Sequence, residues 1–394
     1  MAREVSVVIV GGGPSGLATS ACLNRLSIPN IVLEKDECLA PLWRKRTYDR
    51  LKLHLAKRFC NLPHMPFPSD APTFVPRVQF MRYLDDYVSR FKISIRYNRT
   101  VETAAMLEGT GKWKVVVKDT SSDAYEVYVS EFVVVASGEN SEGCIPELNG
   151  LEEYEGEYMH CNRYVNGREW YNKNVLVVGA GNSGMEIAFD LFNWGANTSI
   201  VVRSPVHVLT KEMVMVGMHL GKYVGVEMVD RLMIVLSKLK YGDMSKYGLR
   251  RPKEGPFFVK AARGRAPTID VGCVHQIKAG KVFPAISSIK TNKVIEFEDG
   301  RQDQFDVIIF ATGYRSTALN WLKDYKELFN EDGKPKRKYP NHWKGENGIY
   351  CAGFSSRGLE GISYDAQKIA DDIAMALAPN NFTAAIGTYP LLND

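Results

Sequence analysis

Two glycine-rich turns, each between a strand-like run and a helix-like run, constrain this chain more than any other feature. The first lies in residues 7–16, which read VVIVGGGPSG, and the second lies in residues 175–184, which read VLVVGAGNSG. In such a turn the first glycine bends the chain, the second lets the backbone approach a pyrophosphate, and the third lets the helix pack on the strand. The free N–H groups at the helix start then bind the anion. The chain is therefore predicted to bind two dinucleotides.

The predicted cofactor contacts in these turns come from both glycine sequences. They are Gly11, Gly13, Pro14, Ser15 and Gly16 in the first turn, and Gly179, Gly181, Asn182, Ser183 and Gly184 in the second. Pro14 falls at the start of the helix, where the missing N–H costs nothing. Asn182 is also a candidate for the reaction site. Its amide either bonds the cofactor or closes the turn locally, and the sequence does not separate the two roles.

The residues that end the following strand indicate which nucleotide each turn binds. After the first turn the strand ends in Glu34-Lys35, and after the second it ends in Arg203-Ser204. A carboxylate at this position accepts from a ribose 2′-hydroxyl and repels a 2′-phosphate, whereas an arginine with a hydroxyl suits a 2′-phosphate. The first site is therefore predicted to bind FAD and the second to bind NADPH.

The composition excludes several other classes of protein. The 394 residues suffice for two domains, and 50 Lys and Arg against 45 Asp and Glu make the chain only mildly basic. No basic run is interleaved with aromatic residues, so nucleic acid is not an expected partner. The seven cysteines are scattered and form no CxxC pair, which argues against a disulfide framework, a zinc site or a redox dithiol. Reduced thiols indicate a cytoplasmic protein.

No targeting or membrane-spanning segment is expected. A strand-like run begins by about Val5, which leaves no room for a signal peptide. The most apolar later stretch, residues 213–236, contains four charged side chains and is not expected to span a bilayer. Association with a membrane surface stays open.

The remaining pattern alternates helix and strand signals along the whole chain. Helices are expected near residues 15–26, 78–91, 183–194 and 363–377, and strands near residues 93–97, 113–117, 126–129, 132–136, 306–311 and 348–352. Three of these strands end in turns that we expect to contact the cofactors. The residues concerned are Ser137, Gly138, Thr312, Gly313 and Gly353.

This order predicts an α/β fold with two Rossmann-like, dinucleotide-binding domains. If the last strand returns to the first sheet, the FAD domain is discontinuous and the NADPH domain is inserted into it. The expected ranges are 1–165 and 300–394 for the FAD domain and 166–299 for the NADPH domain. A helical, methionine-rich insertion spans about 205–251. Its methionines are either ordinary helix packing or an adaptable apolar lid over a substrate channel.

Several motifs resemble those of class B flavin-containing monooxygenases. That family carries FxGxxxHxxx(F/Y) between its two nucleotide turns, and residues 154–164 match it with Tyr154 in place of the first phenylalanine, followed by Gly156, His160 and Tyr164. His160 and Tyr164 either position the linker between the domains or simply pack there. The chain is closer still to the YUCCA proteins of plants. The similar runs are residues 43–55, 136–140, 181–186, 269–272 and 311–314.

The resemblance implies FAD, NADPH and O2, and a 2-oxo acid as the small-molecule substrate. It implies oxidative decarboxylation of indole-3-pyruvate to indole-3-acetic acid, the auxin, through a flavin peroxide that must be shielded from water. The alternative is an N- or S-oxygenating flavin monooxygenase of small soft nucleophiles. Departures from the family occur at residues 38–42, Ala56, residues 165–167, Glu360 and Ile362. The last two are expected close to the flavin edge, where they bear on substrate preference.

The resemblance also suggests residues beside the flavin. Trp43 is an expected contact, and His54 falls where other members carry an active-site asparagine. His54 either bonds the oxygen intermediate or is a core histidine bonded to backbone. Lys52, two residues earlier on an extended segment, would point to the same face. Lys52, Arg265 and Arg357 are the candidates for binding the substrate carboxylate, and the sequence does not choose among them.

Overall fold

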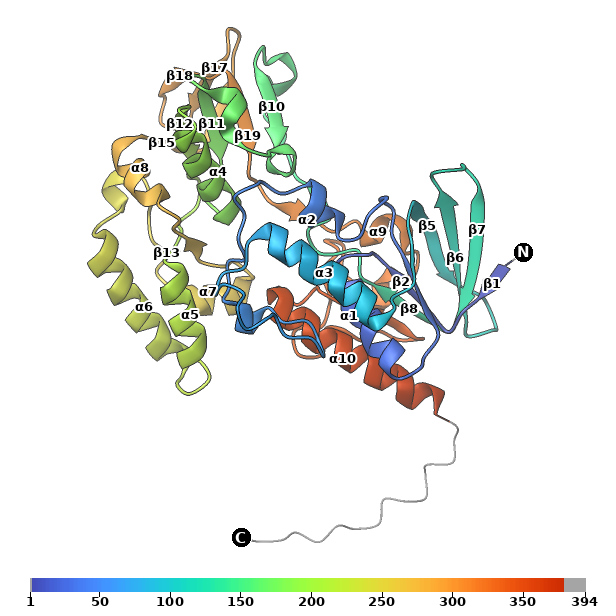
Figure 1. Cartoon of the computed structure of the whole chain (residues 1–394). Coiled ribbons are helices and arrows are strands. Elements are labelled where there is room, and N and C mark those ends of the chain that lie inside the picture. The colour runs from blue at the N-terminus through green and yellow to red at the C-terminus, as the bar shows by residue number, and fades with distance from the viewer. Residues whose placement is uncertain (1, 379–394) are drawn as a thin grey trace, which may run out of the picture.

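Two five-stranded parallel sheets organise the computed structural model, which describes residues 2–378 (Figure 1). The first sheet has the order β21-β8-β2-β3-β4 and the second has the order β10-β19-β11-β12-β15. The strands of the first are β2 (Val7–Val10), β3 (Asn30–Leu33), β4 (Ile95–Arg96), β8 (Phe132–Val135) and β21 (Ile349–Cys351). Those of the second are β10 (Glu157–His160), β11 (Asn174–Val178), β12 (Asn197–Val201), β15 (Lys281–Phe283) and β19 (Val307–Phe310).

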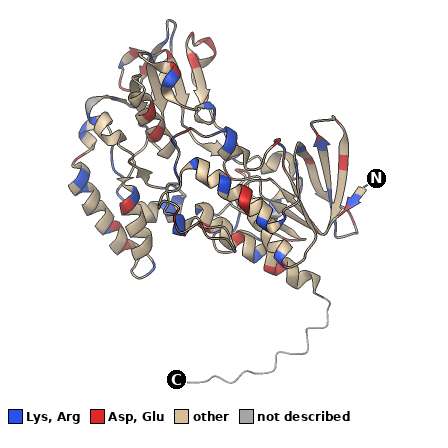
Figure 2. Ribbon diagram, viewed as in Figure 1, with Lys and Arg blue, Asp and Glu red and all other residues tan. Residues whose placement is uncertain are grey.

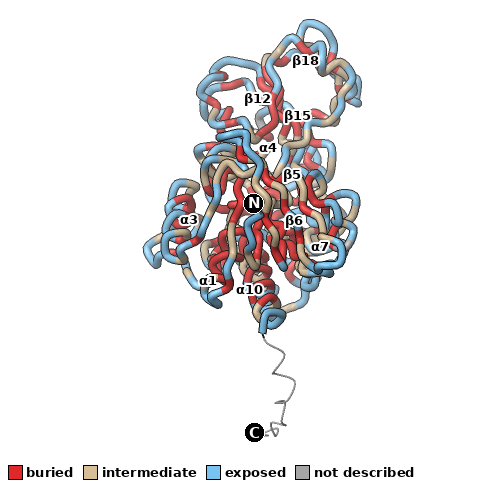
Figure 3. Tube along the Cα trace, turned by 90° about the vertical axis from the view of Figure 1, so that its right-hand side faces the viewer, coloured by how far each residue is buried: buried red, intermediate tan, exposed pale blue. Residues whose placement is uncertain are grey.

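Helices cover both sheets because the inner strands are apolar on both faces. All four residues of β2, β8 and β19 are buried. Helix α1 (Pro14–Arg25) packs between α3 (Arg77–Phe91) and α10 (Gly358–Leu377) on the first sheet, and α4 (Asn182–Asn193) packs with α8 (Cys273–Ala279) on the second. Figure 3 shows the buried segments running through the interior of both units and the exposed turns at the outside.

The return of β21 to the first sheet makes the first unit discontinuous, as the fold prediction required. β21 pairs with β8 after the whole second sheet has been built. The predicted boundaries, however, were wrong in two places. β10 and β19 pair with each other and β19 pairs with β11, so residues 157–160 and 307–310 belong to the second sheet and not to the first unit. A short strand carries no local signal for the sheet that it joins.

Smaller sheets and helices complete the two units. A four-stranded sheet contains β1 (Ala2–Glu4), β5 (Arg99–Met106), β6 (Trp113–Asp119) and β7 (Tyr125–Ser130), and a three-stranded sheet contains β16 (Ile286–Ile289), β17 (Val294–Phe297) and β18 (Gln302–Gln304). Two two-stranded pairs are β13 (Val208–Leu209) with β14 (Thr268–Ile269), and β9 (Glu142–Gly143) with β20 (Tyr314–Arg315). Short helices are α2 (Pro41–Lys45) and α9 (Ala318–Trp321). The sequence missed β5, whose polar and apolar residues alternate only partly.

The methionine-rich insertion folds as helices beside the second sheet, at the left of Figure 1. Its helices are α5 (Lys211–Leu220) and α6 (Val226–Tyr241), and α7 (Pro256–Arg263) follows just beyond the predicted bounds of the insertion. Met233 is fully buried in a small core with Val214 and Val229, which is ordinary helix packing. Met228, on the opposite side of α6, is 65% exposed. Core packing therefore accounts for only part of the methionine pattern.

Charged side chains of both signs are interspersed over both units (Figure 2). Within residues 2–378, none of the helices has the length and apolar character needed to cross a membrane.

Tyr164 lies between β10 and β11, within the second unit and not in a linker between the sheets, and it ties this connection to α4. Its hydroxyl donates to Asp190 Oδ2 at 2.6 Å, and its ring stacks on Trp170 at a centroid distance of 5.5 Å. Burial raises the pKa of Tyr164 far above the physiological range, so the hydroxyl stays a donor. Asp190 also accepts from Gly167 N at 3.0 Å.

We expect Tyr164→Phe to lower the free energy of unfolding by roughly 1–3 kcal/mol, because a buried carboxylate loses one of its donors. Chemical denaturation measures the change. The control is Tyr171→Phe, since Tyr171 is 66% exposed and should change stability by less than about 0.5 kcal/mol. Equal effects of the two variants would contradict the assigned role of the Tyr164 hydroxyl.

Candidate active site between two dinucleotide-binding units

The carboxyl ends of the strands gather the predicted cofactor residues of each unit at one edge. In the first sheet Val10 lies opposite Leu33 and Val135, and Val135 lies opposite Cys351. The chain leaves these four positions into the turns that contain Gly11, Glu34, Ser137 and Gly353. In the second sheet Val178 lies opposite Val201 and Phe310, so the second glycine turn shares its edge with the segments around Arg203 and Thr312. Ligands of open parallel sheets bind at such edges.

Both glycine turns have the conformation that only glycine adopts easily. Gly11 has φ +119° and Gly179 has φ +116°. A Cβ on Gly16 would lie 2.0 Å from the carbonyl oxygen of Gly11, and a Cβ on Gly184 would lie 1.9 Å from that of Gly179. Each helix therefore approaches its own turn closely enough to exclude any side chain.

The middle glycines leave the space that a dinucleotide needs. A Cβ at Gly13 or Gly181 would meet nothing within 4 Å. Both residues are helix N-caps without a side-chain cap, so the first N–H groups of α1 and α4 have no capping acceptor from the N-cap. Ser137 Oγ is also buried without a hydrogen-bond partner among the described residues. These features fit a pyrophosphate at each helix start.

The carboxylate of Glu34 hydrogen-bonds the backbone of the first glycine turn. Its side chain is buried, its Oε2 accepts from Gly12 N at 2.7 Å, and its Oε1 accepts from Asp36 N at 3.0 Å. Burial raises the pKa of Glu34, while the two backbone N–H groups oppose that shift. Each carboxylate oxygen keeps a second lone pair for a ribose hydroxyl. The neighbouring Lys35 is exposed and makes no ion pair within the described chain.

Arg203 and Ser204 follow β12 at the edge of the second sheet. Arg203 is exposed, and among the residues described here no carboxylate lies within ion-pair distance of it. A guanidinium without a protein partner beside an open glycine turn is available to an anionic ligand. Ser204 is partly exposed next to it.

The remaining strand-end residues build the backbone around the two sites. Thr312 Oγ1 bonds the carbonyl of Cys144, and Gly313 has φ +94°. The carbonyl of Gly313 accepts from His160 Nε2 at 2.9 Å, a bond between two residues of the second unit. Gly353 has φ +84° and donates its N–H to Asp365 Oδ2 at 2.9 Å. A Cβ on Gly353 would lie 2.1 Å from Ser15 Oγ, so this turn adjoins the first glycine turn.

Residues 43–55 form the junction segment, which lies where the two units meet. Trp43, on α2, packs against the cores of both units, with its ring edge-on to Phe80 at 4.7 Å. Leu51 belongs to the core of the second unit and Leu53 to that of the first. Leu55 contacts the first core and the small core of the helical insertion.

The polar centre of this junction is Glu186, a residue of α4 that is 2% exposed. His54 Nε2 lies 3.0 Å from Glu186 Oε1, and Arg50 Nε lies 4.0 Å from Glu186 Oε2. The guanidinium of Arg50 also lies 4.4 Å from the ring centroid of Phe189. Because a carboxylate only accepts, His54 Nε2 must carry the hydrogen, which leaves Nδ1 as the free ring nitrogen. His54 is thus bonded to a side chain of the other unit and not to backbone.

Asn182 takes a local structural role with its amide oxygen. Asn182 Oδ1 accepts from Ile269 N at 2.7 Å and so connects the start of α4 to β14. The hydroxyl of Thr268 donates to the carbonyl of Ala180 at 2.8 Å beside it. The amide nitrogen of Asn182 has no hydrogen bond among the described residues, so a bond to the cofactor stays a prediction.

Sequence reasoning missed three charged residues of the junction. Glu186 and Arg50 stand inside runs that carry the family resemblance, and Lys211 opens α5. The one available signal is a glutamate among apolar residues inside a helix, because such a charge needs a partner when it is buried. That partner, His54, is 132 positions away and carries no local signal.

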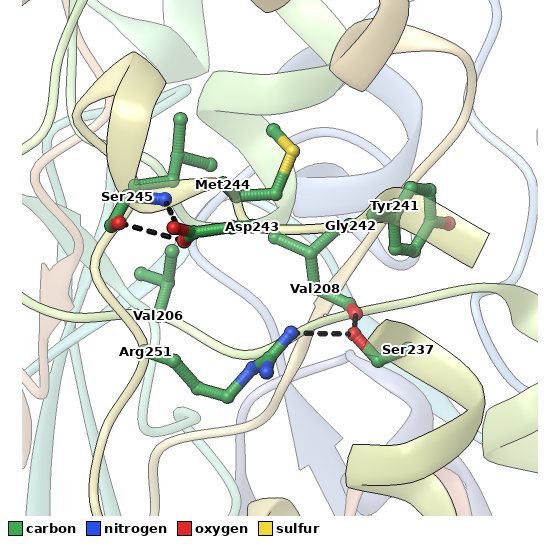
Figure 4. Close-up of a pocket in the computed structure, with 10 residues that line it drawn as sticks. Val206, Val208, Ser237, Tyr241, Gly242, Asp243, Met244, Ser245 and Arg251 are labelled. Atoms are coloured by element: carbon green, nitrogen blue, oxygen red, sulfur yellow. Dashed lines mark hydrogen bonds between the residues drawn. The ribbon is translucent and has the colours of Figure 1, made fainter. Parts of the chain in front are cut away.

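Neither of the two described cavities is lined by residues of the glycine turns. One, of about 140 Å³, lies in the helical insertion, where Arg251 donates to Ser237 Oγ at 3.3 Å (Figure 4). The other, of about 350 Å³, is lined by Asn174 and Asn197, the first residues of β11 and β12. It lies at the amino ends of the strands, opposite the edge where ligands of such sheets bind.

Fold and site together define a protein built on two dinucleotide-binding units whose edges meet at a buried polar junction. The model of the flavin-binding monooxygenase-like family matches residues 4–326, and the chain belongs to that family. This confirms the resemblance found in the sequence.

The chain is 54% identical over 378 residues to a probable indole-3-pyruvate monooxygenase of Arabidopsis thaliana, YUCCA10, covering 95% of this chain and 98% of the relative. It is 44% identical over 373 residues to indole-3-pyruvate monooxygenase YUCCA1 of Oryza sativa subsp. japonica, covering 93% and 90%. The fold is similar to a flavin-containing monooxygenase from Stenotrophomonas maltophilia, with a TM-score of 0.72 and 19% identity over 95% of this chain and all of that one. It is also similar to OTEMO in complex with FAD and NADP, with a TM-score of 0.74 and 15% identity over 95% and 85%.

The contrast between Gly16 and Gly13 yields a test of the first turn. Gly16→Ala should unfold or strongly destabilise the protein, because its Cβ would overlap the Gly11 carbonyl. Gly13→Ala should leave the fold intact, because its Cβ meets open space, yet should weaken FAD binding where the backbone approaches the phosphates. Thermal unfolding and flavin content measured on both variants separate the effects. A stable, flavin-loaded Gly16→Ala protein would contradict the close approach.

Proposed function

We propose that the protein is an FAD- and NADPH-dependent monooxygenase that oxidatively decarboxylates a 2-oxo acid, with indole-3-pyruvate as substrate and indole-3-acetate as product. The observation that carries the proposal is identity along nearly the whole chain to a probable indole-3-pyruvate monooxygenase, with both glycine turns intact. The reaction consumes indole-3-pyruvate, O2, NADPH and a proton. It yields indole-3-acetate, carbon dioxide, NADP+ and water, so one oxygen atom enters the acid and the other leaves as water.

The residues of each edge would bind one cofactor. The N–H groups at the start of α1 would hold the FAD pyrophosphate, and Glu34 would accept from the adenosine ribose. The start of α4 would hold the NADPH pyrophosphate, with Arg203 and Ser204 on the 2′-phosphate. When bound, FAD supplies hydride acceptance from NADPH and activation of O2. The chain itself supplies binding, orientation and exclusion of water.

The junction segment would shield the reacting groups from water. Trp43 and Leu55 bridge the apolar cores of the units, which closes this side of the junction with apolar surface. His54 is the polar exception. With its Nε2 hydrogen directed to Glu186, the neutral ring offers only the Nδ1 lone pair, and donation from Nδ1 requires the imidazolium form. Glu186 would thus fix the orientation of a ring that bonds substrate or oxygen.

NADPH consumption by the FAD-loaded protein, with and without indole-3-pyruvate, tests the proposal directly. We expect the 2-oxo acid to increase product formation, and mass spectrometry to find indole-3-acetate in proportion to NADPH oxidised. Oxygenation of a small amine or thioether, with no acid formed from indole-3-pyruvate, would support the N- or S-oxygenating alternative and overturn the proposal.

Selectivity for NADPH over NADH tests the second site. Arg203→Ala should cost roughly 1.5–3 kcal/mol of binding, about ten- to a hundredfold in apparent NADPH affinity, while NADH is affected little. Steady-state kinetics with both cofactors give the ratio. The control is Arg168→Ala, which removes another exposed arginine of the chain. An unchanged ratio in Arg203→Ala means that another cation binds the phosphate.

The role of His54 is tested by the coupling of NADPH oxidation to product formation. His54→Leu should preserve flavin reduction by NADPH but lower indole-3-acetate formed per NADPH and raise hydrogen peroxide, because both ring nitrogens are lost. It also leaves Glu186 with Arg50 alone, so coupling must be measured on the folded, flavin-loaded fraction. His275→Leu, at an exposed position of α8, is the control. Normal coupling together with lower stability would make His54 a structural residue.

A further inference from the structure

Three cations lie at the junction and form what we call the junction cations: Arg50, whose Nε is 4.0 Å from Glu186 Oε2, the half-buried Lys211 and the exposed Lys52. Arg50 and Lys52 lie on the junction segment, and Lys211 is the first residue of α5 in the helical insertion. Glu186, Lys52 and Arg50 are all close enough to Lys211 to shift its pKa. The group therefore brings together charges from both sides of the junction.

The position of the Lys211 side chain is unfavourable for a positive charge unless an anion binds it. It follows the N-cap residue Thr210, whose hydroxyl accepts from Met213 N at 3.1 Å, so its ammonium belongs to the positive end of the α5 dipole. It is half-buried, with its Nζ 5.4 Å from the ring centroid of Phe74. Burial lowers the pKa of Lys211, and the charges of Lys52 and Arg50 lower it further, against the opposing effect of Glu186 and Glu212.

The carboxylates nearby are already engaged. One oxygen of Glu186 bonds His54 and the other faces Arg50. Glu212 is exposed, and its own backbone N–H and the Thr210 hydroxyl hold its pKa below the usual range. Among the described residues, the ammonium of Lys211 has neither an ion pair nor a hydrogen bond. Even with both glutamates counted, three cations face two carboxylates.

The other candidate cations are better satisfied. Arg357 lies 3.7 Å from Glu360 and stacks over the ring of Tyr339 at 4.4 Å. Burial lowers the pKa of the half-buried Lys260 against the opposing effect of Glu139, but its Nζ donates to the carbonyl of Gly264 at 3.4 Å. Arg265 is exposed. Of the cations compared, Lys211 combines burial, an unfavourable helix end and an unpaired ammonium.

We propose that Lys211, with Lys52 beside it, is the subsite that binds the carboxylate of an aryl 2-oxo acid. This rests on the proposed function. The ring of Phe74 lies against the Lys211 ammonium, and Leu55 and Met213 pack on the small core of the helical insertion. The aryl group of the substrate would therefore find apolar neighbours next to the charge. A substrate anion would relieve the repulsion among the junction cations and the unfavourable position at the start of α5.

The test compares a carboxylate with its neutral amide. We would measure binding of indole-3-acetate and indole-3-acetamide to the FAD-loaded, oxidised protein without NADPH, by titration calorimetry. The wild-type protein should prefer the acid. Lys211→Met should weaken binding of the acid by about tenfold or more and leave the amide unchanged, and Lys211→Arg should restore part of the preference. An unchanged ratio of acid to amide in Lys211→Met overturns the proposal.

Lys222→Met is the matched control. Lys222 lies in the same insertion with its Nζ 5.5 Å from the ring centroid of Phe59, but it is exposed and is not among the charges that shift Lys211. It should leave the ratio unchanged. NADPH affinity and the rate of flavin reduction should also survive Lys211→Met. A fall in NADPH affinity without a change in the acid-to-amide ratio would assign Lys211 to a cofactor phosphate and overturn the proposal.

The subsite and the proposed function can fail separately. A wild-type protein that forms no indole-3-acetate, but whose preference for the acid depends on Lys211, would retain the subsite and lose the function. A wild-type protein that forms indole-3-acetate, with an unchanged KM for indole-3-pyruvate in Lys211→Met, would retain the function and lose the subsite.

Discussion

The buried contact between His54 and Glu186 is the interaction on which the arrangement of the two units depends most. It joins a segment of the first unit to a helix of the second, and it does so at 3.0 Å with a carboxylate that is 2% exposed. Burying a charge is costly unless polar partners compensate. The junction segment must therefore bring His54 and Arg50 to Glu186, and the relative position of the glycine turns follows from that requirement.

The apolar contacts of the same segment work in the same direction. Trp43 packs against the cores of both units, and Leu55 packs against the first core and that of the helical insertion. Full burial of a large apolar side chain contributes on the order of 1.5–3 kcal/mol, and Trp43 and Leu55, which are partly buried, contribute less. Apolar packing stabilises the contact between the units but does not fix their relative orientation, whereas the His54–Glu186 bond specifies which atoms meet. The junction combines the two in thirteen consecutive residues, 43–55.

The glycine turns and the junction present positive charge to a ligand in different ways. At each glycine turn the anion-binding groups are backbone N–H groups, which carry no net charge and suit any dinucleotide. At the junction the excess charge comes from side chains, above all the ammonium of Lys211, which has no ion pair with any residue from 2 to 378. Side-chain cations can change between relatives without disturbing the fold, so substrate preference can vary while cofactor binding is kept. The departures at Glu360 and Ile362 lie in the first turns of α10, outside the glycine turns.

The sequence by itself determined the two glycine turns, the strands that lead into them and the α/β class, because these features depend on neighbours within about ten residues. A Cβ on Gly16 or Gly184 would collide with the turn immediately before it, and the glycine spacing alone reveals that constraint. Only the tertiary structure decided the sheet of β10 and β19, the bond between His54 and Glu186, and the position of Lys211 among the junction cations. Those contacts join residues more than a hundred positions apart, and a polar or apolar side chain carries no signal for the distant partner that will satisfy it.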